Sequence, residues 1–505
     1  MAIIKKKISQ RRKQVRENIA AERLAKFRDI INSGVPTSIL ILVSFAAICS
    51  TMLSLVTGPE KIAWLDWPQF VALSFMICLI ACGIAVYIHH YNRRIIKNHV
   101  RATALAGLFI ILLAIIKLGS FFQNPAYFAI ATTVTAAIIL TIAYDQRFAI
   151  GMSIFYASMA YFGVGQKADF ELFLAMGSGI LTCCFLLREI RTRTKLLEVG
   201  ILAALAIFIT SVCVGLATKP FDVELLKYSG WAALTTILVG IIIQALLPII
   251  EKVFRIATSL TLLAYSDASK PLLKKLAMEA PGTFSHSLLI GSLAEAAAEA
   301  IGANGLLCRV GAYYHDIGKI GKPRYFVENQ MGMASRHEQL SPAMSQLIIV
   351  GHVKDGVEMA KEYGLPAAIR EFIETHHGTT LIEYFYQEAK KQSNGKTAPP
   401  AEAEFRYPGP RPQSREAAIV MLSDAVEGAV RSVTEATPTK IETVVHNMAM
   451  RRLQDGQFDE CELTLSQLSQ IEKSLSKTLA AHYHGRIAYP KAVDKPDEET
   501  EKVEQ

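Results

Sequence analysis

Eight long apolar stretches in the first half of this 505-residue chain constrain its fold more than any other feature. Most are about as long as a helix that crosses a bilayer, which needs roughly 20 apolar residues, and two are short for that purpose. The sequence therefore predicts a polytopic helical membrane domain with about eight spans. The stretches cover residues 37–57, 68–88, 103–122, 127–143, 148–164, 170–187, 197–217 and 230–250.

The second half of the chain has a different composition. Of all residues 51% are hydrophobic, but the long apolar runs end near residue 250, and apolar positions then recur at helical spacing. A stretch from about 390 to 412 contains five prolines and predicts a flexible loop. We therefore expect an all-α protein with a basic arm at 1–36, the membrane domain at 37–250, an amphipathic connector at 251–280, a soluble helical domain at 281–490 and an acidic disordered tail at 491–505.

Basic residues indicate which ends of the spans face the cytoplasm. Residues 1–28 contain ten Lys or Arg and two Glu, and such an arm beside a membrane segment is better explained as topogenic or lipid-facing than as a site for nucleic acid. The second and sixth loops are also basic, whereas the alternate loops carry two Lys or fewer. The positive-inside rule then predicts that the N-terminus and the second half both lie in the cytoplasm. These loop residues are Arg93, Arg94, Lys97, Arg101, Arg188, Arg191, Arg193 and Lys195.

The spans carry almost no ionisable side chains. Transporters and proton pumps usually place carboxylates, arginines or histidines along their path, so this pattern argues against transport as the main task. The first span is better explained as an uncleaved anchor than as a signal peptide, because its basic region is long and no small-residue cleavage site follows it.

Histidine and aspartate residues of the second half stand beside apolar residues, where ionisable side chains are unusual. His315 and Asp316 are adjacent in the segment Ala312–Lys319, and His376 and His377 form a second pair. A lone histidine, such as His286 or His352, is more often a capping or surface residue than a ligand, whereas for the pair His376–His377 the two explanations are about equal. Together they make sense as metal ligands, because coordination offsets the loss of hydration. The candidate ligands are His286, His315, Asp316, His352, His376, His377 and Asp424.

The kind and number of these ligands indicate a metal and a chemistry. Imidazole and carboxylate without thiolate suit iron, manganese or a similar divalent ion better than structural zinc. Seven ligands are too many for one ion but fit two ions about 3.5–4 Å apart, and Asp316 has two oxygens with which to bridge them. Such a pair supplies a hydroxide nucleophile and polarises a phosphoryl group. We therefore expect phosphoester hydrolysis.

The order of these residues resembles a known signature. They read H…HD…H…HH…D along the chain, which is similar to the pattern of the binuclear members of the HD-domain phosphohydrolase superfamily. The segments Glu279–His286, Val310–Lys319 and His376–Thr380 resemble the bacterial seven-transmembrane HD (HDIG) family, whose PgpH-type members are cyclic di-AMP phosphodiesterases. One initial anchor plus that family's seven spans gives the eight spans counted above.

This resemblance implies a fold, a site and a substrate. It implies an all-helical HD domain in which the seven candidate ligands hold two metal ions and Asp316 bridges them. It implies a multi-pass protein of the bacterial inner membrane that hydrolyses a cyclic dinucleotide, with cyclic di-AMP cleaved to pApA as the leading reaction. The family's large extracytoplasmic sensor domain is missing, because only Gly58–Pro68 separates the first two spans.

Three further residues near the ligands are candidates for the reaction. Lys319 lies three residues after Asp316, on a nearby helical face. It either contacts a phosphate or the leaving oxygen, as a catalytic residue beside His315 and Asp316, or is a surface lysine. Arg406 and Tyr407, in a loop rich in Pro and Gly, either reach the nucleotide or have a structural role. His337 is better explained as a loop or supporting residue than as a ligand.

Two alternatives keep this fold and change the function. The same site would also suit cyclic di-GMP, another nucleotide or another phosphoester, because nothing in the sequence reads the base. A receptor or scaffold that binds a nucleotide without turnover is the other alternative, although the intact ligand set argues against it. Beyond the substrate and the bilayer, we consider a second copy of the chain, in a homodimer, as a partner; no nucleic-acid polymer is expected.

Overall fold

The structure is a computed structural model of the chain. It describes residues 35–57, 62–92, 95–96, 98–122, 124–165, 168–187, 192, 194–218, 220–330, 334–393, 400–433 and 436–484. The basic arm up to residue 34 and the acidic tail lie outside the described residues. So do most of the basic loop residues that predict the orientation, namely Arg93, Arg94, Lys97, Arg188, Arg191 and Arg193. The chain separates into two compact units, Met1–Leu260 and Thr261–Gln505.

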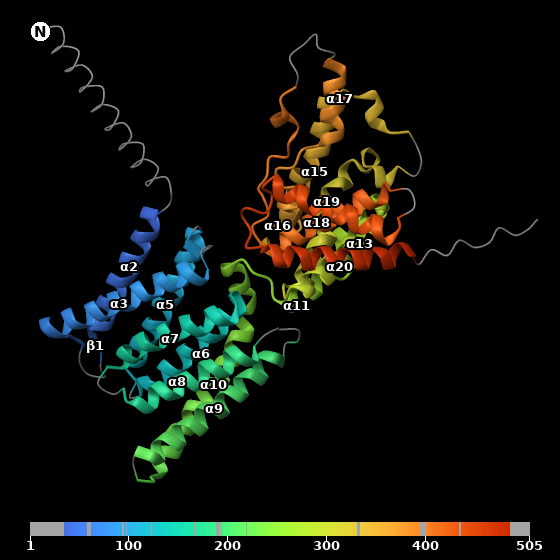
Figure 1. The fold of residues 1–505 in the computed structure, drawn as a ribbon. Coiled ribbons are helices and arrows are strands. Elements are labelled where there is room, and N and C mark those ends of the chain that lie inside the picture. The colour runs from blue at the N-terminus through green and yellow to red at the C-terminus, as the bar shows by residue number, and fades with distance from the viewer. Residues whose placement is uncertain are drawn as a thin grey trace, which may run out of the picture. The chain divides into compact units, whose positions relative to one another are not determined.

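Apolar helices build the first unit, and each of the eight predicted spans overlaps one of them (Figure 1). Helix α6 packs against α5, α7, α8 and α10, and residues such as Ala136 and Leu140 are fully buried in it. The helices are α2 (Val35–Ser54), α3 (Trp67–Tyr91), α5 (His99–Gly119), α6 (Pro125–Ala143), α7 (Gln146–Val164), α8 (Phe170–Leu186), α9 (Thr194–Thr218) and α10 (Val223–Phe254).

Length and composition divide these helices into two groups. In the described part of the chain, six are long and apolar enough to cross a membrane, and α7 and α8 are the two that are not among them. Helix α8 has 17 residues, and α7 buries residues such as Phe148, Met152 and Tyr156 completely. A helix that is packed among other helices exposes little surface to lipid and therefore needs less apolar character. The predicted all-helical membrane domain of about eight spans is consistent with this arrangement.

The connection between α2 and α3 contains a β-hairpin, which the sequence patterns did not predict. Strands β1 (Leu55–Thr57) and β2 (Ile62–Trp64) pair antiparallel, with Leu55 opposite Trp64. Lys117 on α5 donates to the carbonyls of Leu53 and Leu55, at 3.1 and 3.0 Å. Since α2 ends at residue 54 and α3 begins at residue 67, no folded domain fits between these two helices.

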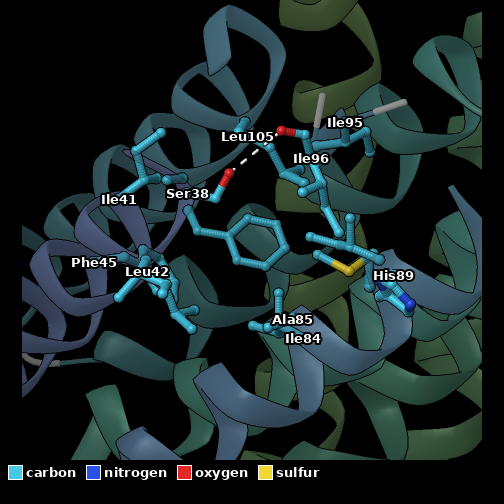
Figure 2. Close-up of a pocket in the computed structure, with 16 residues that line it drawn as sticks. Ser38, Ile41, Leu42, Phe45, Ile84, Ala85, His89, Ile95, Ile96 and Leu105 are labelled. Atoms are coloured by element: carbon cyan, nitrogen blue, oxygen red, sulfur yellow. Dashed lines mark hydrogen bonds between the residues drawn. The ribbon is translucent and has the colours of Figure 1, made fainter. Parts of the chain in front are cut away.

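One pocket of the first unit lies between the first half of α2, the last turns of α3 and the first half of α5 (Figure 2). Its volume is about 330 Å³ and its walls are mostly aliphatic, with the ring of Phe45 among them. Ser38 closes one edge by donating from Oγ to the carbonyl of Ile96, at 3.3 Å. Among the described residues that line it, none is a carboxylate, a lysine or an arginine. The pocket therefore offers apolar contacts rather than a site for the expected chemistry.

Helices also build the second unit, and the all-α prediction is confirmed there too. Its core is formed by apolar residues of α13, α14, α18, α19 and α20, among them Ile290, Ala312 and Ile471. The α-helices are α11 (Ser259–Tyr265), which spans the boundary between the units, α12 (Pro271–Glu279), α13 (Pro281–Ala300), α14 (Gly305–Tyr314), α15 (Pro342–Glu362), α16 (Ala367–Thr375), α17 (Glu383–Ser393), α18 (Arg415–Arg431), α19 (Pro438–Gln454) and α20 (Leu465–His484). The 3₁₀ turns are η2 (Ile317–Gly321), η3 (Pro323–Tyr325), η4 (Val327–Asn329), η5 (Arg336–Gln339) and η6 (Glu402–Phe405).

Side-chain caps explain where several of these helices begin. Asn304 accepts a hydrogen bond from the backbone N–H of Leu307 at 3.0 Å, and Ser414 accepts one from Ala417 at 3.2 Å. Each cap satisfies a backbone donor that has no partner inside the helix, which is worth about 1 kcal/mol. The caps of α14 and α18 thereby fix the start of two helices that lead into the site.

The structure differs from the predicted flexible loop at 390–412 at both ends of that segment. Helix α17 continues to Ser393, so the first residues of the predicted loop are helical. Residues after 400 are held in place, because Tyr407 donates from its backbone to Thr380 at 3.0 Å and Ile382 donates to Phe405 at 2.9 Å. The prolines misled the prediction: they prevent helix formation but also restrict the backbone, and here they accompany a segment that packs on the domain. Residues 394–399 lie outside the described residues.

Candidate metal centre

All seven predicted ligands meet at one place in the second unit. His286 lies on α13, His352 on α15 and Asp424 on α18. His315 and Asp316 follow the end of α14, and His376 and His377 follow the end of α16. The ends of two helices therefore deliver an adjacent pair each, while the other three helices deliver one side chain from their middle. These helices are labelled in the second unit in Figure 1, except α14.

Asp316 lies at the centre of this cluster and is almost completely buried. Its Oδ1 lies 3.4 Å from Nε2 of His352 and 3.5 Å from Nε2 of His376. Its Oδ2 lies 3.1 Å from Nε2 of His315 and 3.9 Å from Nε2 of His286. The two oxygens thus face two different pairs of imidazoles.

Asp424 and His377 lie beside these two pairs of imidazoles. Oδ1 of Asp424 lies 3.0 Å from Nε2 of His286 and 3.8 Å from Nε2 of His315. Its Oδ2 lies 3.9 Å from Nδ1 of His377. Two overlapping groups each have their ligand atoms within 4.8 Å of one another, and both groups include Asp316. The groups are Asp316, His352, His376 and His377, and His286, His315 and Asp316.

Hydrogen bonding leaves the inner atoms of these side chains available to metal ions. Nδ1 of His315 lies 2.6 Å from the carbonyl of Ala312, and Nδ1 of His376 lies 3.0 Å from that of Ile373. A carbonyl accepts only, so each Nδ1 carries the proton and Nε2 faces the cluster as a lone pair. Nε2 of His315 and Oδ1 of Asp316 are buried and have no hydrogen-bond partner. Such atoms need a partner, and a divalent cation fits all of them.

Electrostatics hold most of these groups in the form that binds a metal. Burial lowers the pKa of His352 to about 3, and burial with His376 and His352 lowers the pKa of His377 well below its usual range. Burial opposes the charged form of Asp316, but His315 and Lys319 outweigh it and keep the pKa of Asp316 well below its ordinary value. Neutral imidazoles and ionised carboxylates are the forms that coordinate metals.

Gly318 lets the segment after His315 and Asp316 approach α15 closely. A Cβ atom at this position would lie 1.8 Å from the carbonyl oxygen of His352 and 2.6 Å from the backbone nitrogen of Gly356. Only glycine permits this contact. The contact brings Asp316 next to His352, although the two residues are far apart in the sequence.

Lys319 lies beside the cluster, where the sequence predicts it. Its Nζ lies 2.7 Å from Oδ2 of Asp316 and donates to Oε1 of Glu328 at 2.8 Å. Burial opposes its charged form, but Asp316 and Glu328 outweigh burial and raise the pKa of Lys319. The side chain is therefore a fixed positive charge at the edge of the cluster, not a freely solvated surface lysine.

A cavity of about 730 Å³ opens next to the cluster. Lys319, His352, His377 and Tyr407 line it together with aromatic side chains and both polar and charged groups. The ring of Tyr407 stacks on that of His377, with 4.3 Å between the centroids. The remaining walls include Tyr325, Phe326, Glu328, His337, Tyr384 and Phe385.

The structure separates Arg406 and His337 from the ligands. Arg406 is not among the residues of the cavity; its guanidinium donates to both oxygens of Asp455, at 2.9 and 3.1 Å, to Glu402, and to the carbonyl of Thr379. These bonds use its donors within the protein, so we do not retain Arg406 as a substrate contact. His337 lies in the cavity wall, where Nε2 is 2.9 Å from the carbonyl of Tyr325.

Two glutamates support the site, the partly buried Glu328 and the buried Glu427, and the sequence patterns missed both. Glu328 accepts from Lys319 and from Thr283 Oγ1, the latter at 3.0 Å. Glu427, three residues after Asp424 on α18, lies 2.9 Å from Nδ1 of His286. Burial opposes protonation of His286, but hydrogen bonds to Asp424 and Glu427 outweigh it and raise the pKa of His286 to about 9. The only sequence signal for Glu427 was its spacing from Asp424, which places both on one helical face.

Two family models match the chain. The model described as "7TM receptor with intracellular HD hydrolase" matches residues 67–258, and the model described as "HD domain" matches residues 283–429. The chain belongs to the seven-transmembrane HD hydrolase family. The first match runs from α3 to α10 and contains seven apolar helices, so α2 is the additional first one. The second match contains all seven predicted ligands.

Individual members of this family are similar over most of the chain. The cyclic-di-AMP phosphodiesterase PgpH of Bacillus subtilis is 38% identical over 445 residues, 84% of this chain and 61% of that protein. The cyclic-di-AMP phosphodiesterase PgpH of Listeria monocytogenes is 35% identical over 429 residues, 84% of this chain and 59% of that protein. The chain therefore spans about 60% of the length of these two relatives.

A solved structure of this family is similar to part of the chain. It is the crystal structure of the L. monocytogenes phosphodiesterase PgpH HD domain in complex with cyclic-di-AMP. The two sequences are 47% identical, the match covers 43% of this chain and 100% of the solved chain, and the TM-score is 0.41. The family matches and the apolar helices confirm the predicted family and a membrane protein with a helical HD domain.

Proposed function

We propose that this chain is a membrane-anchored, metal-dependent phosphodiesterase that hydrolyses cyclic di-AMP to pApA. The observation that carries the proposal is the buried carboxylate of Asp316, whose two oxygens each face a separate pair of imidazoles, at 3.1–3.9 Å. A carboxylate between two ligand groups is suited to two neighbouring metal ions. Membership of an HD hydrolase family supports hydrolysis as the reaction.

The proposed cofactor is a pair of divalent ions, iron or manganese. His286, His315, Asp316 and Asp424 would hold one ion, and Asp316, His352, His376 and His377 would hold the other. The donor set of imidazoles and carboxylates favours iron or manganese over softer metals. When bound, two such ions supply Lewis acidity and an activated water for attack on phosphorus.

The residues around the cavity would bind and orient the substrate. Lys319 presents a positive charge where the cavity meets the cluster and would stabilise negative charge on the phosphate or on the leaving oxygen. Tyr407, stacked on His377, would hold that imidazole in its orientation. The aromatic walls would stack on the bases, which is a sequence-tolerant contact.

The choice of cyclic di-AMP rests on the relatives. Both PgpH proteins are named cyclic-di-AMP phosphodiesterases, whereas aromatic stacking alone does not separate adenine from guanine. Cyclic di-GMP is therefore the comparison substrate in any assay. A nucleotide receptor without turnover remains the alternative outcome of the same experiment, and a homodimer remains a prediction of the sequence.

We further infer that the chain is a multi-pass protein of the bacterial inner membrane whose N-terminus and HD unit lie in the cytoplasm. Eight crossings bring both ends of the membrane unit to one side, and the excess of Lys and Arg in alternate loops assigns that side. Cysteine substitutions in the loop at 58–61 and in the HD unit, labelled in intact cells with a membrane-impermeant reagent, test this. Labelling confined to the loop is expected, and labelling confined to the HD unit would reverse the orientation.

Hydrolysis by the full chain in lipid nanodiscs tests the proposed function. With Mn²⁺ or Fe²⁺ present, cyclic di-AMP should yield pApA, and a variant with both His315→Ala and Asp316→Ala should be inactive. Faster turnover of cyclic di-GMP than of cyclic di-AMP would make cyclic di-GMP the substrate instead. Tight binding of cyclic di-AMP without any product would make the chain a receptor.

A further inference from the structure

His286 differs from the other ligands in what its outer nitrogen contacts. Its Nδ1 lies 2.9 Å from Oε2 of Glu427 and 3.0 Å from Nη2 of Arg431. The carboxylate only accepts a hydrogen bond and the guanidinium only donates one. The two neighbours therefore demand opposite protonation of the same nitrogen.

The choice between these neighbours decides whether His286 can bind a metal. If Nδ1 carries the proton, it donates to Glu427, and Nε2 presents its lone pair toward Asp316 and Asp424. If Arg431 donates to Nδ1 of a neutral ring, the proton sits on Nε2 and occupies the position of the coordinate bond. In this structure Nε2 also lies 3.0 Å from Oδ1 of Asp424, which only accepts, so it carries a proton that a metal ion would have to displace. The ring then binds the ion through Nε2 only if the remaining proton stays on Nδ1, and the neighbours of Nδ1 decide that.

The geometry around Glu427 favours the first arrangement. Glu427 is 4% exposed, and a buried carboxylate needs donors. Arg431, one turn later on α18, donates from Nε to Oε1 of Glu427 at 3.0 Å and also contacts Oε2 through Nη2. Glu427 thus binds Arg431 and His286 at once, and the ion pair keeps the guanidinium engaged with the carboxylate rather than with the imidazole.

We propose that Glu427 is a positioning residue that selects the metal-binding tautomer of His286 against the competing donor Arg431. The inference rests on the proposed metal site. His315, His352 and His376 need no such residue, because their Nδ1 atoms face backbone carbonyls, at 2.6, 2.5 and 3.0 Å, which accept only. The metal position that includes His286 therefore depends on side-chain chemistry that the position around His352 and His376 does not share.

Metal binding without substrate tests this proposal separately from the proposed function. The full chain in nanodiscs is titrated with Mn²⁺, and bound metal per chain is measured by equilibrium dialysis and elemental analysis. Glu427→Ala should weaken one of two Mn²⁺ equivalents by about 10–100-fold, the usual range for a supporting residue, and leave the other unchanged. Arg431→Ala should bind both ions nearly as the parent chain does, because Glu427 remains.

The double variant Glu427→Ala with Arg431→Ala decides between tautomer selection and simple packing. Removal of the competing donor should restore part of the affinity that Glu427→Ala loses, whereas a packing role predicts that the double variant is no better than the single one. That result, or Mn²⁺ affinity unchanged in Glu427→Ala, would overturn the proposal. Glu427→Gln, which keeps the side-chain shape and a carbonyl acceptor, should bind with intermediate affinity and covers the case that alanine impairs folding.

Glu416→Gln is the matched control. Glu416 lies on the same helix and its carboxylate accepts a hydrogen bond from the backbone of Asn304, at 3.1 Å, but it contacts none of the predicted ligands. Unchanged Mn²⁺ binding is expected for it. A loss equal to that of Glu427→Gln would assign the effect to α18 as a whole and contradict the specific role of Glu427.

Discussion

The two sides of Asp316 have different surroundings, although one carboxylate serves both. On the Oδ1 side, His352 and His376 are oriented by backbone carbonyls, and burial keeps His352 neutral, with its pKa lowered to about 3. On the Oδ2 side, Lys319 contacts Asp316 itself, and His286 contacts Asp424, Glu427 and Arg431. His315 on this side is oriented by the carbonyl of Ala312. Backbone carbonyls therefore orient both histidines of the first side, whereas on the second side the orientation of His286 depends on charged side chains. Substitutions should therefore separate the two.

Asp316→Asn should have the largest effect because it alters both sides at once. An amide presents one oxygen and one donor, so only one side keeps an acceptor. We expect at least one Mn²⁺ equivalent to be lost, together with about 1,000-fold or more of the hydrolysis rate. Metal per chain and the rate of pApA formation measure both. Retention of two ions at the parent affinity would show that the two oxygens do not serve two ions.

Gly318→Ala should disturb the close packing of η2 against α15. Its Cβ would lie 1.8 Å from the carbonyl oxygen of His352, so η2, which follows Asp316, must move away from α15. We expect a loss of about 1–3 kcal/mol in the free energy of unfolding, measured by denaturation of the full chain. Gly321→Ala is the control, because a Cβ at Gly321 meets no heavy atom within 4 Å. Equal losses in both variants would remove the special role of the contact with His352.

Lys319→Met should change only the surroundings of Oδ2 of Asp316. It removes the ammonium at 2.7 Å from Oδ2 of Asp316 and keeps an unbranched side chain. We expect kcat to fall by about 100-fold while Mn²⁺ binding persists. Lys322→Met is the matched control, since Lys322 is exposed. If kcat stays within twofold of the parent value, Lys319 is not part of the reaction.

Arg406→Ala should have the smallest effect. Its side chain is partly exposed and pairs with Asp455 and Glu402, so we expect a loss of about 1 kcal/mol or less in stability. KM for cyclic di-AMP should stay the same, because Arg406 does not line the cavity. A tenfold rise in KM with unchanged stability would restore it as a substrate contact.

The predicted ligands stood out in the sequence because each is an ionisable side chain among apolar residues, and the structure brings all seven together. Buried histidines and aspartates in apolar helical segments are costly, so His315–Asp316 and His376–His377 stand out without any structure. Glu427 and Glu328 do not, because a glutamate on a helix or turn usually faces solvent. Their burial depends on which helices pack together, and that information is not in the local pattern. Arg406 shows the opposite: its position in a loop of Pro and Gly suggested contact with the substrate, but it pairs with Asp455, which follows the end of α19.

Helices were more predictable than the segments between them. The apolar stretches and the helical periodicity located the eight apolar helices described in the first unit and the helices α18, α19 and α20 of the second, because both signals are local. The hairpin at Leu55–Trp64 was missed, since three-residue strands are too short to show alternation. The ordered segment after residue 400 was missed as well, because its position depends on hydrogen bonds to the distant residues Thr380 and Ile382.

The hairpin between α2 and α3 has a consequence for how this architecture varies. Its strands pair with Thr57 opposite Ile62, and antiparallel partners lie about 5 Å apart. Entry and exit points for an inserted segment are therefore adjacent, and a tip of this kind tolerates insertion well. A whole domain can be gained or lost at this point in evolution while the helices on either side keep their places.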